Sequence, residues 1–118
     1  MTSLRLALPT KGGRGMRDVI SDVFARAATF TLVDVVDGEV KNVKVEENTA
    51  SALKQGAGPL VTKTLKEKGV EVVVAGELGF GAKTLLEMSG IRAVQVDTGV
   101  KVKDALDEAL KQQLLTAP

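Results

Sequence analysis

The sequence predicts an α/β protein in which helices cover both faces of a mixed sheet. Two observations carry this prediction. The first half of the chain contains an antiparallel hairpin with Asp37-Gly38 at its turn. In the second half, apolar strand patterns alternate with helical patterns, as in a βαβ unit, which produces parallel strands. With 118 residues the chain is long enough for one domain, which we place over residues 1–118.

Three strands are predicted in the first half. Leu4–Leu8 has leucine at every second position, the period-two pattern of a strand, and Pro9 is expected to end it. The hairpin follows, because an Asp-Gly pair readily adopts the positive φ angles of a two-residue turn. Its strands are Phe30–Val36, which is rich in β-branched residues, and Val40–Val45, which alternates.

Two further strands are predicted in the second half. Val70–Ala75 is almost continuously apolar, as expected for a strand buried in a parallel sheet. Ile91–Val96 repeats the unit. Gly69 and Gly90 stand just before these strands, where a glycine that ends the preceding helix is expected. The spacing between the two glycines fits a compact βαβ crossover.

Four helices are predicted, giving the element order β-α-β-β-α-β-α-β-α. The first is short, with Ser21-Asp22 as its N-cap, and the second starts near Pro59, a residue suited to a first helical turn. The last has apolar residues at i, i+3, i+4, i+7 and i+8. The residues that mark the four helices are, in order, Val23, Phe24 and Ala27; Leu60, Val61, Thr64 and Leu65; Ala82, Leu85 and Leu86; and Val102, Ala105, Leu106, Ala109 and Leu110.

The composition excludes several classes of protein. Cysteine and histidine are both absent, which excludes disulfide scaffolds, zinc fingers, cysteine-ligated iron–sulfur clusters and Ser-His-Asp or Cys-His catalysis. The net charge is +1 and aromatic residues are 3%, so we expect no nucleic-acid partner. We also expect no membrane partner and a cytoplasmic location, because the start has no signal-peptide pattern and no apolar run approaches the ~18 residues of a membrane span.

An ordered series of short motifs runs along nearly the whole chain. They are Ala7-Leu8-Pro9-Thr10, Ile20–Ala27 leading to Phe30, Asp37-Gly38-Glu39, Glu47-Asn48, Gly56–Leu60, Lys68–Gly76, Gly79–Ala82 and Ser89-Gly90-Ile91. In this order they resemble the dinitrogenase iron–molybdenum cofactor biosynthesis family, which includes NifX and the C-terminal domain of NifB. The resemblance implies a three-layer α/β/α ribonuclease H-like fold with a five-stranded mixed sheet of order 3-2-1-4-5, in which strand 2 is antiparallel. It also implies an accessory protein that binds an iron–molybdenum–sulfur cluster or its precursor.

The sequence departs from the family at the residues expected to contact a metal. Val23 stands where family members usually carry histidine, Ala25 replaces a glycine, and Thr49–Ser51 lies where a second histidine is common. The weak soft donors that the sequence offers are Met1, Met16 and Met88. A cluster would therefore be held by hydrogen bonds and by cationic side chains rather than by metal–ligand bonds.

Three glycine-containing loops are expected at the carboxyl ends of the parallel strands, where open α/β sheets bind ligands. These loops are Pro9–Gly15, Gly76–Gly81 and Asp97–Gly99. The helix after Gly81 would direct backbone N–H groups into the crevice, which favours an anion. The candidate ligand-binding residues are Lys11, Gly12, Gly13, Arg14, Gly15, Arg26, Gly76, Gly79 and Gly81. Alternatively, the glycines only make tight turns, and Arg26 is a surface or cap-stabilising arginine.

Two enzymatic readings do not fit the residues. Gly76–Thr84 resembles a nucleotide-binding P-loop, but Ala82 stands before Lys83 and would rotate the lysine by about 100° away from the phosphates. A two-metal nuclease needs several clustered carboxylates, and the first strand has none. Asp18 and Asp22, four residues apart, are interpreted as polar surface rather than as ligands of magnesium or calcium. We expect no catalytic activity.

The sequence thus predicts a non-enzymatic carrier of an anionic metal–sulfur cluster or another small anion. The alternative is an interaction module that has lost its ligand and binds a protein partner or a second copy of itself. Val40–Val45 offers an edge strand that could pair with another copy, whereas Lys41 and Lys44 could instead protect that edge.

Overall fold

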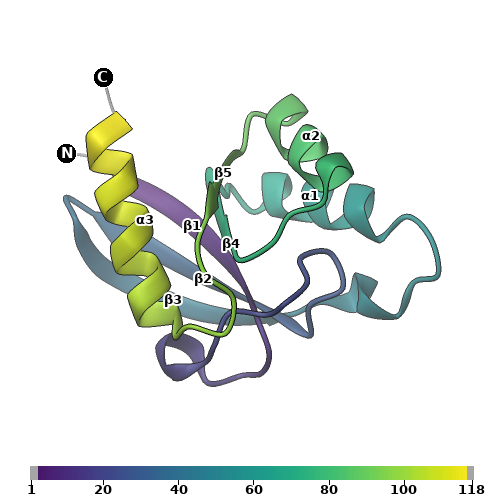
Figure 1. Cartoon of the computed structure of the whole chain (residues 1–118), viewed down its shortest axis with the longest axis horizontal. Helices are drawn as coiled ribbons and strands as arrows, with labels where there is room; N and C mark the ends of the chain where they lie inside the picture. The colour runs from purple at the N-terminus through teal and green to yellow at the C-terminus, as the bar shows by residue number, and fades with distance from the viewer. Residues whose placement is uncertain (1–2, 117–118) are drawn as a thin grey trace.

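The computed structural model describes residues 3–116, and in this part of the chain five strands form one mixed sheet of order β3-β2-β1-β4-β5 (Figure 1). The strands are β1 (Ser3–Thr10), β2 (Thr29–Val36), β3 (Glu39–Glu47), β4 (Val72–Ala75) and β5 (Arg92–Gln95). β2 is antiparallel to β1 and β3, whereas β1, β4 and β5 are parallel. The expected strand order and the antiparallel second strand are confirmed.

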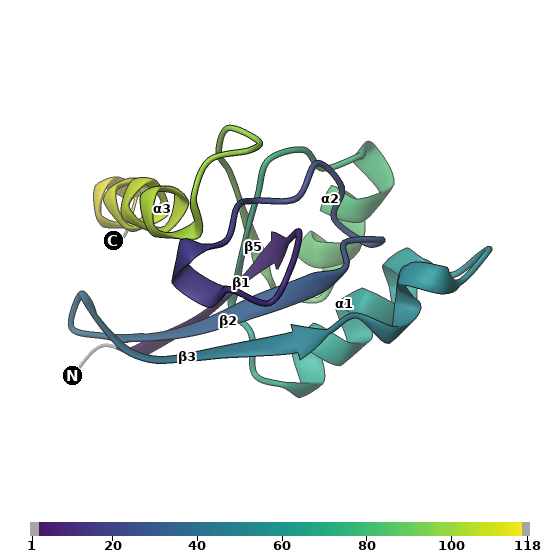
Figure 2. The same cartoon turned by 90° about the horizontal axis from the view of Figure 1, so that it is seen from below.

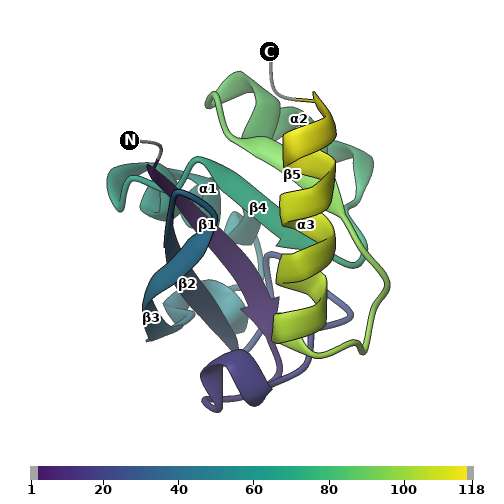
Figure 3. The ribbon, with the colours of Figure 1, turned by 90° about the vertical axis from the view of Figure 1, so that its left-hand side faces the viewer.

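Helices cover both faces of this sheet, which confirms the three-layer α/β/α arrangement (Figure 2). α1 and α2 lie on one face, and α3 with the short 3₁₀ helix η1 lies on the other, where Figure 3 shows α3 in front of the strands. The helices are α1 (Ala57–Glu67), α2 (Phe80–Met88), α3 (Val102–Thr116), η1 (Gly15–Arg17) and η2 (Thr49–Ala52). No helix of the part described is long and apolar enough to cross a bilayer.

The sheet separates two hydrophobic cores, because successive side chains of a strand point to opposite faces. In β1, Ala7 lies in the core under α1 and α2, whereas Leu6 and Leu8 lie in the core under α3. In β2, Leu32 and Val33 divide in the same way. The alternation seen in the sequence therefore reflects two buried faces, in contrast to a strand with one face in water.

The two glycine caps form as predicted, and they end α1 and α2 in the same way. Gly69 has φ 78° and Gly90 has φ 77°, in the left-handed region that glycine adopts without strain. After α1, Val70 N donates to the carbonyl of Leu65 at 3.0 Å; after α2, Ile91 N makes the equivalent bond at 2.9 Å. These are the bonds of a Schellman motif, which turns the chain directly into the next strand.

The expectation that Pro9 ends the first strand is wrong, because β1 continues to Thr10. The carbonyl of Pro9 accepts a hydrogen bond from Ser21 N at 2.8 Å, on the side away from β2. The missing N–H of Pro9 points to that same side, since the N–H and C=O of one strand residue share a direction. The proline therefore leaves the pairing of β1 with β2 intact.

The short helix predicted after Ser21-Asp22 is also wrong. Ser21 Oγ does accept a hydrogen bond from Val23 N at 3.2 Å, but only isolated turns follow. Ile20 lies in the core under α3, whereas Phe24 lies in the core under α1 and α2, so the chain crosses the edge of the sheet between them. A helix would put these residues on one face, because they are four positions apart.

Candidate functional site

The loops that follow β1, β4 and β5 meet at the carboxyl edge of the sheet, as predicted, and backbone hydrogen bonds tie two of them together. Ile20 N donates to the carbonyl of Val100 at 2.8 Å, and Gly99 N donates to the carbonyl of Ile20 at 3.3 Å. Ser21 is bonded in turn to Pro9 at the end of β1. The fully buried Ile20 therefore lies between β1 and the loop before α3, at the edge where a ligand crevice was expected.

Gly76, at the end of β4, is in close contact with the third loop. A Cβ atom at this position would overlap Thr98 Cγ2 and would lie only 3.0 Å from the backbone Cα of Thr98. Glycine is thus required by the approach of two loops. By contrast, Gly79 and Gly81 have open space where a side chain would stand.

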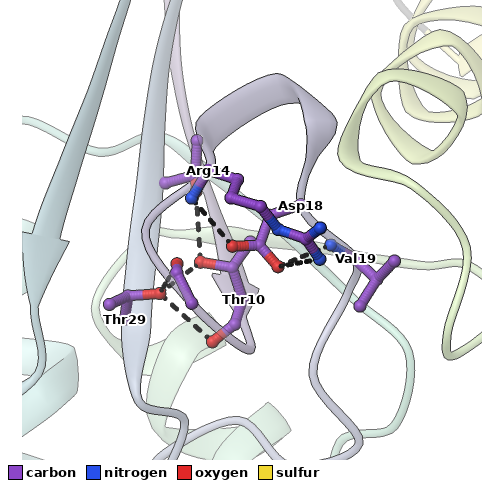
Figure 4. A network of polar contacts seen from close by, with 7 residues as sticks. Thr10, Arg14, Asp18, Val19 and Thr29 are labelled. Carbon is purple, nitrogen blue, oxygen red and sulfur yellow. Dashed lines mark hydrogen bonds and ion pairs between the residues drawn. The ribbon is translucent and has the colours of Figure 1, made fainter.

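The glycine-rich loop after β1 closes around the carboxylate of Asp18, whose side chain is fully buried (Figure 4). Asp18 Oδ2 accepts a hydrogen bond from Arg14 N at 3.0 Å, and Oδ1 accepts one from Val19 N at 2.8 Å. The Gly12 backbone also lies close to this carboxylate, since a Cβ atom on Gly12 would lie 3.2 Å from Oδ2. The interpretation of Asp18 as polar surface is therefore wrong, whereas the Asp22 side chain is 70% exposed.

These contacts also set the acidity of Asp18. Burial alone would raise the pKa of its carboxyl group. The hydrogen bonds from the amides of Arg14, Val19 and Gly12, together with the charge of Arg14, outweigh burial and hold the pKa below its usual range. Asp18 is therefore an anion inside the loop at neutral pH.

Three threonine hydroxyls join the base of this loop to β2. Thr10 Oγ1 lies 2.6 Å from Thr29 Oγ1 and 3.1 Å from Thr31 Oγ1. Thr29 Oγ1 also donates to the carbonyl of Gly12 at 2.5 Å. The sequence analysis missed this cluster, although alternate threonines at 29 and 31 point to one face of a strand and could have indicated it.

Lys11 and Arg14 carry the positive charge expected of this edge. Lys11 Nζ lies 3.8 Å from Asp22 Oδ2, and Arg14 Nη2 lies 3.9 Å from Asp18 Oδ1. The Arg14 side chain is 69% exposed, so its guanidinium group reaches solvent beside the buried carboxylate.

Arg26 is engaged with backbone carbonyl groups just beyond η2. Its guanidinium group donates to Leu53 O, to Lys54 O at 3.0 Å and to Ser51 O at 3.5 Å. These contacts correspond to the cap-stabilising alternative, because they satisfy carbonyl groups at the end of a short helix.

The N-termini of α1 and α2 lie at this same edge, because β3 and β4, which precede them, point in the same direction. The N-cap residues are Gly56 and Gly79, neither of which supplies a side-chain hydrogen bond, and neither helix has an acidic residue in its first turn. The helices contact each other, with Gly58 close to Leu85. From the sequence, only the start of α2 was predicted to bind an anion, because it follows the glycine loop Gly76–Gly81 at the end of a predicted parallel strand.

The donors available for a ligand at this edge are thus mainly N–H groups and cations. Among residues 3–116, no group of three carboxylate, histidine or cysteine side chains is arranged to hold a metal ion. Met16 is partly buried against the core under α3, and Met88 is 81% exposed at the end of α2. Met1 lies outside the described residues.

Residues 3–112 match the family described as dinitrogenase iron-molybdenum cofactor. The chain belongs to this family. It is also similar to the uncharacterized protein MJ0580 of Methanocaldococcus jannaschii, with 27% identity over 108 residues that cover 92% of this chain and 83% of that protein.

Two solved structures of similar proteins have the same fold. The apo form of the orange protein from Desulfovibrio gigas has a TM-score of 0.81 and 28% identity, over 92% of this chain and 88% of that chain. A Thermotoga protein whose name relates it to NifB has a TM-score of 0.74 and 35% identity, with the same coverage of the two chains. This family member thus combines the common fold with a sequence that lacks histidine and cysteine.

Gly76→Ala is expected to destabilise the protein by about 1–3 kcal/mol, because the added methyl group overlaps Thr98. Gly81→Ala is the matched control and should stabilise by about 0.5–1 kcal/mol, since Gly81 lies inside α2 with open space around it. Urea unfolding of both variants measures the difference. Equal stability of the two variants would contradict the contact, whereas recovery in Gly76→Ala/Thr98→Ala would support it.

The stability of the protein is expected to fall with pH through Asp18. Its pKa in the folded protein is lowered, so the ionised group stabilises the fold above the unfolded pKa of about 3.9. That contribution decreases as the pH falls from about 5 toward the folded pKa. Asp18→Asn should cost about 1–3 kcal/mol at pH 7 and should flatten the dependence of unfolding free energy on pH. Parallel pH profiles for the two proteins would show that Asp18 makes no such contribution.

Proposed function

We propose that this protein is a non-enzymatic carrier of an anionic metal–sulfur cluster, or of another small anion, in the manner of nitrogenase cofactor accessory proteins. The observation that carries the proposal is that α1 and α2 begin at one edge of the sheet without side-chain caps and without acidic first turns. Uncapped N–H groups and the positive end of the helix dipole both favour an anion.

Membership in this family supports a metal–sulfur cluster as the class of ligand. The name of the family refers to the iron–molybdenum cofactor, and one similar structure is named for NifB. In this chain the absence of cysteine and histidine removes the usual protein ligands of such metals. The cluster would therefore be held through its outer sulfur atoms, by backbone N–H groups and cationic side chains.

Charge at the surface fits this mode of binding. Lys11 and Arg14 lie in the loop after β1 with their side chains half or more exposed. Each has a carboxylate between 3.8 and 4.0 Å away, so neither is locked in a short ion pair. The Lys11–Asp22 pair is exposed on both sides and contributes little to stability, and the guanidinium group of Arg14 is largely in solvent, which leaves both cations available to an incoming anion. The cytoplasmic location and the lack of catalytic activity belong to this proposal.

An amide NMR titration of the labelled protein under anaerobic conditions tests the function. Tetrathiomolybdate, phosphate and ATP are added in separate titrations. We expect saturable shifts with tetrathiomolybdate at the start of α1, at Gly79 and Gly81, and in the loop Gly12–Gly15. Shifts with ATP alone would instead favour a nucleotide site. If every compound leaves these amides unmoved, the carrier proposal is wrong.

Charge variants test whether Lys11 and Arg14 contribute to the binding of the anion. Lys11→Gln combined with Arg14→Gln should weaken tetrathiomolybdate binding about tenfold or more, because two cations are lost. The matched control is Arg92→Gln combined with Lys111→Gln, which also removes one arginine and one lysine: Arg92 is exposed at the first residue of β5, and Lys111 is exposed about 13 Å along α3 from its first residue. It should bind as the wild type does.

The second candidate function is self-association through β3. This strand forms one edge of the sheet, with Val40 and Val43 42% and 36% exposed. Lys41 and Lys44 each lie 3.1 Å from a glutamate of the same strand, which would protect the edge. Sedimentation equilibrium from micromolar to millimolar concentration distinguishes a β3 edge that pairs with a second copy from one that its lysines protect. A mass that doubles with concentration, and no longer does so after Val43→Lys, would support the interaction module.

A further inference from the structure

The buried carboxylate of Asp18 already occupies the N–H groups that an anion would use in the loop after β1. Oδ2 is 3.0 Å from Arg14 N, and a Cβ atom on Gly12 would lie 3.2 Å from the same oxygen. Oδ1 accepts from Val19 N at 2.8 Å. Backbone amides gathered around one carboxylate, in a loop that glycine allows to approach closely, have the arrangement that backbone nests present to bound anions.

We propose that Asp18 is an internal anion that keeps the loop Lys11–Gly15 closed, and that a bound ligand replaces its carboxylate at the amides of Gly12 and Arg14. This inference deepens the proposed function and rests on it. It identifies a closed resting state of the loop, in which the protein's own side chain takes the place of the ligand.

The backbone of Asp18 is fixed independently of its carboxylate. Asp18 N donates to the carbonyl of Gly15 at 3.0 Å, and the carbonyl of Asp18 accepts from Val102 N at 2.9 Å. The first of these bonds belongs to η1, and the second joins the residue to the first turn of α3. These two bonds hold the main chain of Asp18 without help from its carboxylate, so the proposed exchange involves the side chain alone.

Electrostatics favour a ligand that replaces the Asp18 carboxylate over one that binds beside it. An anion that entered beside the ionised Asp18 would meet a like charge in a buried site, which is strongly unfavourable. If the carboxylate turns into solvent, the incoming anion gains the amides of Gly12 and Arg14 and the guanidinium group, which now lies 3.9 Å from Asp18 Oδ1. The released carboxylate is then solvated.

Asp18→Asn and Glu87→Gln provide a matched pair of variants. Both remove one negative charge, but Asp18 is fully buried at the loop amides, whereas Glu87 is exposed in the last turn of α2, away from the carboxyl edge. Asparagine has one oxygen in place of two, so at least one amide of the loop loses its acceptor. Tetrathiomolybdate should bind Asp18→Asn about tenfold or more tightly than the wild type, with the largest shifts at Gly12 and Arg14. Glu87→Gln should bind as the wild type does.

The outcomes separate this inference from the proposed function. Equal or weaker binding by Asp18→Asn, with saturable binding retained in the wild type, overturns the internal anion and leaves the carrier function standing. Tighter binding by Glu87→Gln to the same extent would reduce the effect to overall charge and also overturn it. If neither the wild type nor Asp18→Asn binds any of the anions, both proposals are wrong.

A measurement on the wild type covers the case in which Asp18→Asn fails to fold. The carbon-13 resonance of the Asp18 carboxyl group is followed during the same titration. It should move with the same midpoint as the amide resonances of Gly12 and Arg14, because all three groups lose their contacts together. A carboxyl resonance that is unchanged at saturation would overturn the proposal.

Discussion

The contacts of Asp18 and of the residues beside it join the end of β1 and the loop after it to the start of α3, which is distant in the sequence. The carboxylate of Asp18 binds the loop after β1, its carbonyl group holds the start of α3, and the residues after it bond to the end of β1. Ile20 then enters the core under α3, and Phe24 enters the core on the other face. The start of α3 and the closure of the sheet edge therefore both depend on the backbone of this short segment, whereas the buried charge holds only the loop after β1.

The chemistry available at the carboxyl edge is limited to the groups that this sequence offers there. Without cysteine or histidine, recognition falls to backbone N–H groups and to lysine and arginine. Such donors respond to the charge and size of a ligand more than to the identity of its metal. Under the carrier function proposed above, the ligand would arrive as a preassembled anion and would be held without a bond from the protein to the metal.

Features with local signals were predictable from the sequence. The hairpin at Asp37-Gly38 and the caps at Gly69 and Gly90 each depend on backbone conformations that one or two residues determine, and all three are present. The resemblance to the family supplied the strand order. The candidate site was predictable only to the level of which loops meet, because strand direction alone decides that.

The errors share one physical cause. Asp18 looks like a surface residue in the sequence, and its burial depends on amides that a folded loop directs at it. The segment after Ser21 has the pattern of a helix, but it has to carry the chain from Ile20 in one core to Phe24 in the other. Pro9 is tolerated because of the direction in which its nitrogen points. Each of these depends on tertiary contacts, about which local patterns carry no information.

The pairing of β1 has a consequence for the order in which the molecule can assemble. On one side β1 pairs with β2 along its whole length, and on the other it pairs with β4 only at Leu6 and Ala7, with Val72 and Val73 as partners. The hairpin of β2 and β3 closes over a two-residue turn, whereas the contact of β1 with β4 joins residues 66 positions apart. Since chain entropy opposes long loops, we expect the hairpin to form before the parallel contact, with the second half of the chain then docking through β4 and through the bonds of Val100 and Val102 to Ile20 and Asp18.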